Sequence, residues 1–432
     1  MSAAEQRSGA HPSGPPPEAW GPLFAIGRQL ARPLQRLFAF EATSGLLLIA
    51  AAAAALFWAN SSASSSYGSL WHTPLGVRFG SVAFERSLEW FVNDVLMAIF
   101  FFVVGLEIRK ELYDGQLSEW RRAALPVVGA LGGMIVPAGI YLALAGAPET
   151  HAGWGIPMAT DIAFALGVLI LLGKRVPAAL RVLLLAVAVI DDLGAILVIA
   201  LFYSSGIALS GLLIAALGVF VILALRALGV RSVPIYILPG VIVWAGVYAA
   251  GIHPTIAGVI IGLLTPVRAW SGVEHESPAD FLLHALHPWV SYAIMPIFAL
   301  ANAGVTMSGM SLSGTGATVS GAVVVALLLG KPLGVVASSA LALKGKLAML
   351  PDGLTMRHLL VLGMVAGIGF TMSLFLAQLA FEDEKLLSAA KLGVLVASAL
   401  ALIVGLILGR ALLTPRTIHH STVSSGVLPP AT

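Results

Sequence analysis

The chain has 432 residues, of which 58% are hydrophobic and only 10% are charged, whereas about 25% of the residues of an ordinary soluble domain are charged. Its mean hydropathy of +0.95 means more apolar surface than a soluble core could bury, so we expect an all-α polytopic membrane protein. The lack of cysteine excludes disulfides, thiolate metal sites and thiol nucleophiles. The net charge of +3 comes from short loops and not from a basic patch interleaved with aromatic residues, so we expect no nucleic-acid partner, and no motif indicates a cofactor.

The first 41 residues precede the first apolar run. Residues 1–22 are rich in Pro, Gly and Ser and are predicted to be disordered. Residues 23–41 mix apolar side chains with Arg28, Arg32 and Arg36, which is typical of an amphipathic helix that lies on anionic membrane lipid. The run from Ala42 is long enough to span a bilayer and has no clear cleavage site, so we interpret it as a retained helix and not as a signal peptide.

Apolar runs of roughly 17–25 residues, the length that crosses the hydrocarbon core of a bilayer, recur through the rest of the chain. We predict about twelve transmembrane helices in one domain of residues 42–411, followed by a tail of residues 412–432. The predicted spans are 42–59, 88–108, 123–145, 152–172, 179–203, 208–225, 234–250, 254–270, 285–305, 318–342, 358–380 and 389–411.

The distribution of Lys and Arg predicts the orientation of these helices. If the N-terminus lies inside, almost all of the 24 basic residues fall on the inner side. The exceptions are Arg78, Arg86, Lys385 and Lys391 on the outer side and Lys331 within a span. Because basic residues accumulate in cytoplasmic loops, both termini are expected to be cytoplasmic.

The first outer loop, residues 72–87, alternates apolar and polar side chains around Gly80 and Ser81. This alternation is typical of a small β-hairpin, and the exposed edge of a hairpin favours pairing with a second copy of the chain. A solvated loop without regular structure is the alternative interpretation, and the sequence does not decide between the two.

Charged side chains within apolar spans are costly, at about 2.5–3.5 kcal/mol on insertion scales, and they are usually functional. Asp94 lies in the outer half of its predicted helix, where a structural cap, a vestibule residue and a site residue are all plausible interpretations. Glu107 and Glu111 lie one turn apart at the inner end of the same helix, and an ordinary cluster of helix-end charges with Arg109 and Lys110 is their alternative interpretation.

Asp191 and Asp192 are adjacent acids near the middle of the apolar span 179–203. Neighbouring residues on a helix point about 100° apart, so the two cannot both face lipid, and we expect both to face the interior of the bundle. Two carboxylates this close in a low dielectric do not easily ionise together. The pair is therefore suited to hold a proton or a cation.

Two of the predicted spans are interrupted. In span 152–172, Pro157 removes a backbone donor shortly before Thr160 and Asp161. A broken helix at membrane depth leaves carbonyls and helix ends available to an ion, together with the Thr160 hydroxyl. A simple proline kink with a buried Asp161 is the alternative interpretation.

In span 358–380, Gly367 and Gly369 flank Ile368 and are followed by Thr371. Close helix packing is the alternative explanation of these glycines. However, the interrupted spans are the fourth and the eleventh, each the middle helix of a set of three, which indicates inverted repeats of helices 3–5 and 10–12. Two broken helices that cross would bring dipole ends of like sign together, and Asp161 could offset the positive ends and Lys331 the negative ones.

Lys331 lies well inside span 318–342, where a buried lysine must deprotonate or find an acid, unless it snorkels to an interface. His284 and His287 lie at i and i+3 near the start of a predicted helix, and His253 precedes another. No third ligand with metal spacing accompanies them, so we expect no zinc site. Near the interfaces, these imidazoles are candidates for a response to pH.

These residues lie in strings that resemble the NhaA-type sodium/proton antiporter family. The most specific strings are ATDIAFALG, VIDDLGAI and GKPLG. Further matching strings run in order from about residue 40 to 410, namely DVLMAIFFFVVGLEIRKEL, GGMIVPAGIY, GIHPTIAGVIIG, LHPWVSYAIMPIFALANAGV and GIGFTMSLF.

The resemblance implies a twelve-helix antiporter in a bacterial inner membrane, with helices 4 and 11 broken and crossing. It implies that Asp191 and Asp192 exchange Na⁺ or Li⁺ for protons, with Asp192 as the main ion ligand and Asp191 in contact with Lys331 when no ion is bound. Asp161 and Thr160 would then sit at the crossing of the broken helices.

The resemblance also implies roles away from the crossing. Glu107 and Glu111 match positions of a cytoplasmic funnel connected with pH sensing, His253 matches a position that tunes the pH response, and the hairpin 72–87 matches the contact of a homodimer. One departure is Leu283, because family members often carry Glu immediately before the corresponding histidine. The activation pH therefore does not follow from the resemblance.

Other function classes fit the sequence less well. An intramembrane aspartic protease uses two acids on different helices and a Gly-x-Gly-Asp string, which this chain lacks. A sodium channel needs an open file of ion sites and no obligatory proton exchange, and the broken inverted repeats and the titratable pair argue against it. A sodium-coupled symporter of a small solute is the nearest alternative, although the midplane polar residues include no aromatic or Arg groups for a solute cavity.

Overall fold

The computed structural model describes the chain from Ala42 to Thr414 except for a few short segments. The predictions for residues 1–41, for the hairpin tip and for the end of the C-terminal tail lie outside the described residues. The described ranges are 42–79, 82–115, 117, 119–204, 206, 208–230, 233–267, 277–307 and 314–414.

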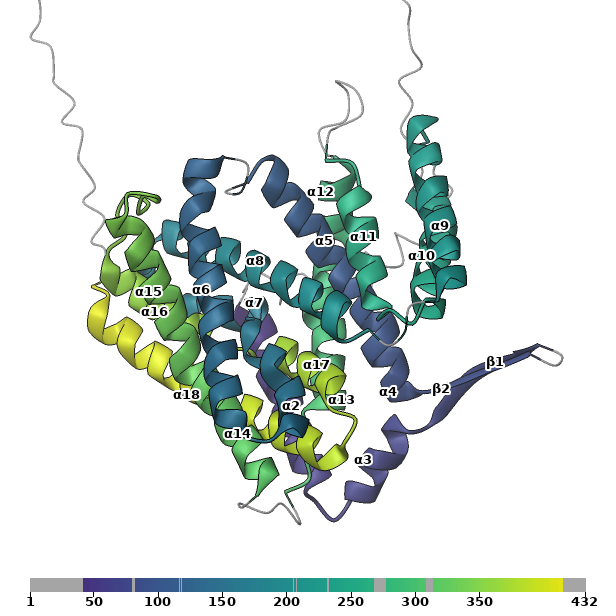
Figure 1. The fold of residues 1–432 in the computed structure, drawn as a ribbon, viewed down its shortest axis with the longest axis horizontal. Helices are drawn as coiled ribbons and strands as arrows, with labels where there is room; N and C mark the ends of the chain where they lie inside the picture. Colours follow the sequence, from purple (N-terminus) through teal and green to yellow (C-terminus); the bar gives the residue numbers. More distant parts are fainter. Residues whose placement is uncertain are drawn as a thin grey trace, which may run out of the picture.

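The described chain is mainly α-helical and carries one pair of strands (Figure 1). Its first half contains α2 (Ala42–Ala59), α3 (Ser64–Trp71), β1 (Pro74–Phe79), β2 (Val82–Ser87), α4 (Leu88–Trp90), η2 (Phe91–Leu96), α5 (Met97–Tyr113), α6 (Trp120–Ala145), η4 (Pro148–Met158), α7 (Ile162–Leu171), η5 (Gly173–Arg175) and α8 (Ala178–Phe202). Its second half contains α9 (Leu209–Ala227), η6 (Val233–Tyr236), α10 (Ile237–Ala249), α11 (Thr255–Leu264), α12 (Pro278–Trp289), η7 (Val290–Ile294), α13 (Met295–Asn302), α14 (Thr315–Val325), η8 (Ala326–Gly330), α15 (Lys331–Lys344), α16 (Met356–Ala366), α17 (Phe370–Ala380) and α18 (Glu384–Leu412).

Many of these helices are suited to a membrane. Within the described ranges, 7 helices are long and apolar enough to cross a bilayer, or up to 10 if each of three bent pairs is one span. The bent pairs are α2 with α3, η4 with α7, and α16 with α17, at 116°, 50° and 45° respectively. Two shorter apolar helices, Val233–Ala249 and Thr255–Leu264, coincide with further predicted spans. The prediction of a mainly helical protein with several apolar spans is confirmed.

The predicted hairpin is confirmed, and the interpretation as an irregular loop is wrong. β1 and β2 pair antiparallel, from Pro74 opposite Ser87 to Phe79 opposite Val82, and they protrude from the helical bundle (Figure 1). Arg86 anchors the base of the hairpin because it donates a 2.8 Å hydrogen bond to the Tyr248 hydroxyl on α10.

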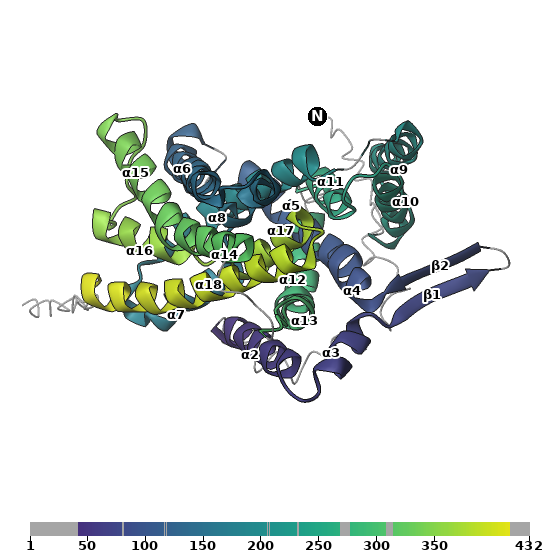
Figure 2. The ribbon, with the colours of Figure 1, turned by 60° about the horizontal axis from the view of Figure 1, so that its bottom comes forward.

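One end of the helical bundle lies at the hairpin, and we refer to it as the hairpin end. At the hairpin end, Tyr67 of α3 donates to the carbonyl of Ala301 (2.9 Å), and Asn60 donates to the carbonyl of Val305 (2.8 Å). At the opposite end, Lys110 of α5 forms an ion pair with Asp280 of α12 (2.5 Å). Figure 2 shows α9 and α10 at one edge of the bundle, far from α15, α16 and α18.

One predicted span begins at the wrong residue. The predicted helix 285–305 begins at Pro278, where the Ser277 side chain accepts a hydrogen bond from the Asp280 amide. A serine cap followed by proline is a strong helix start, but these residues are not apolar and so escaped a search for apolar runs. His284 and His287 consequently lie within α12 and not near its start.

Three segments have π-helical hydrogen bonding: η2, η7 and η8. Pro296 follows η7 and Pro332 follows η8. The ring of a proline clashes with the carbonyl four residues earlier, which lies inside the π segment in both cases, so the wider turn relieves that clash. The widened turn η8 ends immediately before Lys331.

The helices α6 and α15 cross at two glycines. A Cβ atom on Gly334 would collide with the backbone of Gly132. This close approach brings α15 against the side of α6 and fixes the depth at which Lys331, less than one turn before Gly334, enters the bundle.

Candidate functional site

The adjacent acids Asp191 and Asp192 lie in the middle of α8. Both side chains are 0% exposed, although the helix has lipid-facing positions such as Leu197 and Leu201. Two ionisable groups are therefore held inside the bundle, where the free-energy cost of an unpaired charge is high.

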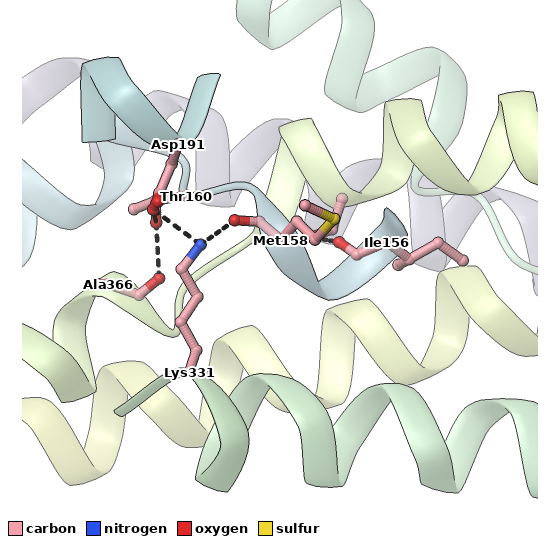
Figure 3. Close-up of polar contacts among 7 residues, drawn as sticks. Ile156, Met158, Thr160, Asp191, Lys331 and Ala366 are labelled. Atoms are coloured by element: carbon pink, nitrogen blue, oxygen red, sulfur yellow. Dashed lines mark hydrogen bonds and ion pairs between the residues drawn. The ribbon is translucent and has the colours of Figure 1, made fainter. Parts of the chain in front are cut away.

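Asp191 is paired with a buried lysine from α15 (Figure 3). The Lys331 Nζ atom lies 2.9 Å from Asp191 Oδ2, and both side chains are 0% exposed. Lys331 also donates a hydrogen bond to the carbonyl of Met158 at the end of η4. The ammonium group thus contacts both the acid and the C-terminal end of the first half-helix, where the helix dipole is negative.

Thr160 connects the same acid to the second broken helix. Its hydroxyl lies 2.8 Å from Asp191 Oδ2 and 2.9 Å from the carbonyl of Ala366, the last residue of α16. A hydroxyl group has a single proton to donate, so Thr160 can satisfy only one of these two acceptors at a time.

Asp161 joins the N-terminal ends of two half-helices. Its Oδ1 accepts a hydrogen bond from the Phe164 amide in the first turn of α7 (2.9 Å). Its Oδ2 accepts from the Thr371 amide in the first turn of α17 (3.2 Å) and from the Thr371 hydroxyl. One carboxylate therefore lies at the positive dipole ends of both helices, which it stabilises electrostatically.

The two interruptions contact each other through hydrogen bonds. Backbone and side-chain hydrogen bonds join Asp161 to Ile368 (2.8 Å), Thr160 to Ala366 (2.9 Å) and Ser373 to Ile156 (2.7 Å). Between Ile156 and Asp161 the partner changes from Ser373 back to Ile368, so over this length the two segments run in opposite directions, whereas the adjacent Thr160 and Asp161 bond to Ala366 and Ile368 in the same chain direction.

The residues predicted to break these helices lie at the breaks. Pro157 is in the last turn of η4, Gly367 caps the end of α16, and Gly369 immediately precedes α17. The first half of the fourth span is a 3₁₀ helix and not the α-helix that hydropathy suggests.

Asp192 differs from the other buried acids because neither of its oxygens has a partner. Within the described part of the chain, Asp192 Oδ1, Asp192 Oδ2 and Asp191 Oδ1 are buried without a hydrogen-bond partner. A buried carboxylate without a partner is costly, and binding of a proton or a cation would relieve that cost. Carboxylate oxygens are ligands preferred by small, hard cations.

The pH-response candidates lie away from this cluster in two groups. Near the opposite end, His287 Nδ1 lies 3.7 Å from Glu107 Oε1, with Glu111 one turn further along α5. His284 lies one turn before His287 on α12. Among the described residues, no group of three His, Asp or Glu side chains has the arrangement of a metal site.

The second group lies nearer the hairpin end. His253 Nε2 is 3.6 Å from Asp94 Oδ1, and Asp94 is only 8% exposed. The neighbouring Asn93 accepts a 2.8 Å hydrogen bond from the buried Asn302 of α13. This asparagine pair could not be predicted from the sequence, because an isolated Asn within an apolar run does not reveal its partner.

Comparisons with known proteins identify the family of the chain. Residues 35–408 match the sequence model of the family described as Na+/H+ antiporter 1. The chain belongs to this Na⁺/H⁺ antiporter family. It is therefore a multi-pass membrane transporter and not an enzyme.

Named antiporter relatives cover nearly the whole chain. It is 58% identical over 438 residues to Na(+)/H(+) antiporter NhaA 2 of Myxococcus xanthus, with 92% of this chain and 93% of the relative covered. It is 51% identical to Na(+)/H(+) antiporter NhaA of an Acidovorax species, covering 90% and 94%. It is 48% identical to Na(+)/H(+) antiporter NhaA of Escherichia coli, covering 86% and 96%.

Proposed function

We propose that this antiporter exports Na⁺ or Li⁺ in exchange for protons across the bacterial inner membrane and so contributes to cytoplasmic pH and sodium homeostasis. The observation that carries the proposal is Asp192, whose two carboxylate oxygens are buried without a partner beside an Asp191 that is already paired with Lys331. The names of the relatives support sodium as the cation.

In the proposed cycle the Asp191–Asp192 pair binds either protons or a cation, because the same oxygens serve both. A cation at Asp192 attracts the Asp191 carboxylate as a second ligand and weakens its ion pair with Lys331. Lys331 can then release a proton, so more than one proton can move per cation and the exchange is electrogenic. Asp161 keeps the half-helix ends in place during this exchange.

We further propose twelve membrane crossings with inverted repeats of helices 3–5 and 10–12. The antiparallel contacts between the two broken helices support this arrangement. Both termini are proposed to be cytoplasmic, which makes the hairpin end the outer end. Residues 23–41 would lie on membrane lipid, and the hairpin 72–87 would join two protomers in a homodimer.

A sodium-coupled symporter of a small solute is not supported. The relatives are named antiporters. Two cavities among the described residues, of about 630 and 260 Å³, are lined by residues other than Asp161, Asp191 and Asp192.

The test is a transport assay in inverted membrane vesicles loaded with a pH-sensitive dye. Addition of Na⁺ or Li⁺ should release protons and dequench the dye, whereas K⁺ should not. An equal response to K⁺, or no response at any pH from about 6 to 9, would contradict the proposal.

A further inference from the structure

One face of α17 connects the candidate ion site to the hairpin end. Thr371, Phe375 and Gln378 lie at i, i+4 and i+7 and therefore share a face of the helix. Thr371 bonds to Asp161 at the start of the helix, whereas Gln378 lies in its last turn, close to the hairpin end. Movement of this face of α17 would change the contact with Asp161 and the structure at the hairpin end together.

Phe375 blocks the path between the candidate ion site and the hairpin end. It is 1% exposed, and its ring centroid lies 5.4 Å from that of Phe101 on α5 and 6.2 Å from that of Phe298 on α13. The ring of His253 meets it edge-on at 5.3 Å. Apolar packing of this density leaves no room for a hydrated cation, so the ion site is closed toward the hairpin end.

A polar contact lies beyond this aromatic cluster. Gln378 Nε2 donates a 2.8 Å hydrogen bond to Glu89 Oε1 on α4. Gln378 Oε1 is buried without a partner among the described residues, so in that part of the chain the amide makes its one side-chain hydrogen bond to Glu89.

Glu89 and Gln378 lie on helices that pack in different groups. Glu89 begins the helix that continues through η2 into α5, which packs on α11 and α12, whereas α17 and α18 pack on η4, α14 and α16. Alternating access moves one such group against the other around a central site. The contact between Glu89 and Gln378 crosses the boundary that must open.

We propose that Glu89 and Gln378 form a latch that holds the hairpin end closed over the ion site, and that its release opens the site toward that end. This inference rests on the proposed antiport, in which the hairpin end is the outer end. Glu89 and Gln378 are positioning residues, because neither belongs to the candidate ion site. They set the proportion of molecules whose site faces each side.

The experiment measures the apparent KM for Na⁺ separately on each side, in proteoliposomes in which the protein has one orientation. Loss of a hydrogen bond to a charged acceptor shifts a two-state equilibrium by roughly tenfold. Glu89→Leu should therefore raise the KM at the end opposite the hairpin and lower the KM at the hairpin end. Gln378→Leu should shift both values in the same directions, and the double variant of Glu89→Leu with Gln378→Leu should shift them by less than the product of the single effects.

Two further variants separate charge from bonding. Glu89→Gln keeps an acceptor for Gln378 but removes the charge, so its shifts should lie between those of wild type and Glu89→Leu. Glu384→Gln changes another acid, which lines a cavity of about 260 Å³ at the hairpin end, and it should leave both KM values unchanged. If Glu89→Leu fails to insert, Gln378→Leu alone carries the test.

The outcome that overturns the latch is distinct from failure of the antiport itself. KM values that stay constant, or that move in the same direction on both sides, would assign these residues a structural role only. Absence of exchange in the wild type would instead contradict the proposed function.

A labelling experiment gives a readout without transport. Because the chain has no cysteine, Ala301→Cys introduces a single thiol. Ala301 lies near the end of α13, is 6% exposed and accepts a hydrogen bond from Tyr67. A membrane-impermeant maleimide added from the hairpin side should label this cysteine faster in the Glu89→Leu background than in the wild-type background. Equal labelling rates would contradict the latch.

Discussion

The Lys331 ammonium group lies 2.9 Å from Asp191 Oδ2, and neither side chain has any exposed surface. One residue further along α8, Asp192 is equally buried but has no partner within the described ranges. One of two neighbouring acids is thus paired with a lysine, whereas the other has no protein partner within that part of the chain. Under the proposed function this difference gives the two acids different tasks, and it leads to the first two predictions.

Asp192→Asn should abolish exchange, because the amide can neither carry the proton nor contribute an anionic oxygen to the cation. The protein should still insert, since the substitution is isosteric. Dye dequenching in vesicles measures the loss, and the amount of protein in the membrane measures insertion. Asp352→Asn, a change in an exposed loop, is the matched control. Near-normal exchange in Asp192→Asn would place the ion site elsewhere.

Lys331→Ala should leave Asp191 as an uncompensated buried acid. Removal of one partner from a buried ion pair destabilises a protein by about 3–5 kcal/mol, so the thermal unfolding temperature in detergent should fall. The double variant Lys331→Met with Asp191→Asn should recover much of that loss. Any remaining exchange in Lys331→Ala should be slower or electroneutral, as tested by clamping the voltage with K⁺ and valinomycin. Voltage-insensitive exchange by the wild type would argue against the extra proton.

The apparent KM for Na⁺ should rise as the pH falls, because protons compete for the oxygens of Asp191 and Asp192. Raising the proton concentration increases the protonated fraction and leaves fewer sites for the cation, so the inhibition should be competitive and reversed by more Na⁺. Initial rates measured over a range of Na⁺ concentrations at several pH values test this expectation. A KM that stays flat across about pH 6 to 9 would exclude competition.

Asp161→Ala should impair exchange less than Asp192→Asn does, because its proposed role is to offset dipoles and not to bind the cation. Thr371→Val removes the hydroxyl bond to Asp161 but keeps the amide bond, so it should cost about 1.5–3 kcal/mol of stability. Thr371→Ser should retain most of that stability. Thermal unfolding in detergent ranks the three variants, and a Thr371→Val protein as stable as the wild type would contradict this role of the hydroxyl.

Deletion of the hairpin 72–87 should yield monomers that still exchange ions. The five charged or hydroxyl side chains that bond to one another at the crossing come from one chain, so we expect a protomer to be complete without its partner. Light scattering on the detergent-solubilised protein reports the oligomeric state. A dimer that survives the deletion would exclude the hairpin as its main contact.

The sequence predicts much of this site because its signals are local. Pro157 and Gly367 lie at the interruptions since proline and glycine act on the backbone at their own positions. The partners of the buried groups, in contrast, cannot be predicted from local signals. The contacts of Thr371 with Asp161, and of Gln378 with Glu89, join residues more than 200 positions apart in the chain. They depend on which helix faces meet, and no local pattern encodes that choice.

The two acceptors of Thr160 have a consequence for how the ion site communicates with the rest of the bundle. When Asp191 is ionised, its oxygen attracts the hydroxyl proton, and the carbonyl of Ala366 is left without that donor. When Asp191 takes up a proton or engages a cation, the hydroxyl is free to turn and join the end of α16 to the segment before α7. The charge on the Asp191 carboxylate therefore determines whether this hydrogen bond joins the two broken helices. Binding of a proton or a cation at the site would thus change the rigidity of the crossing.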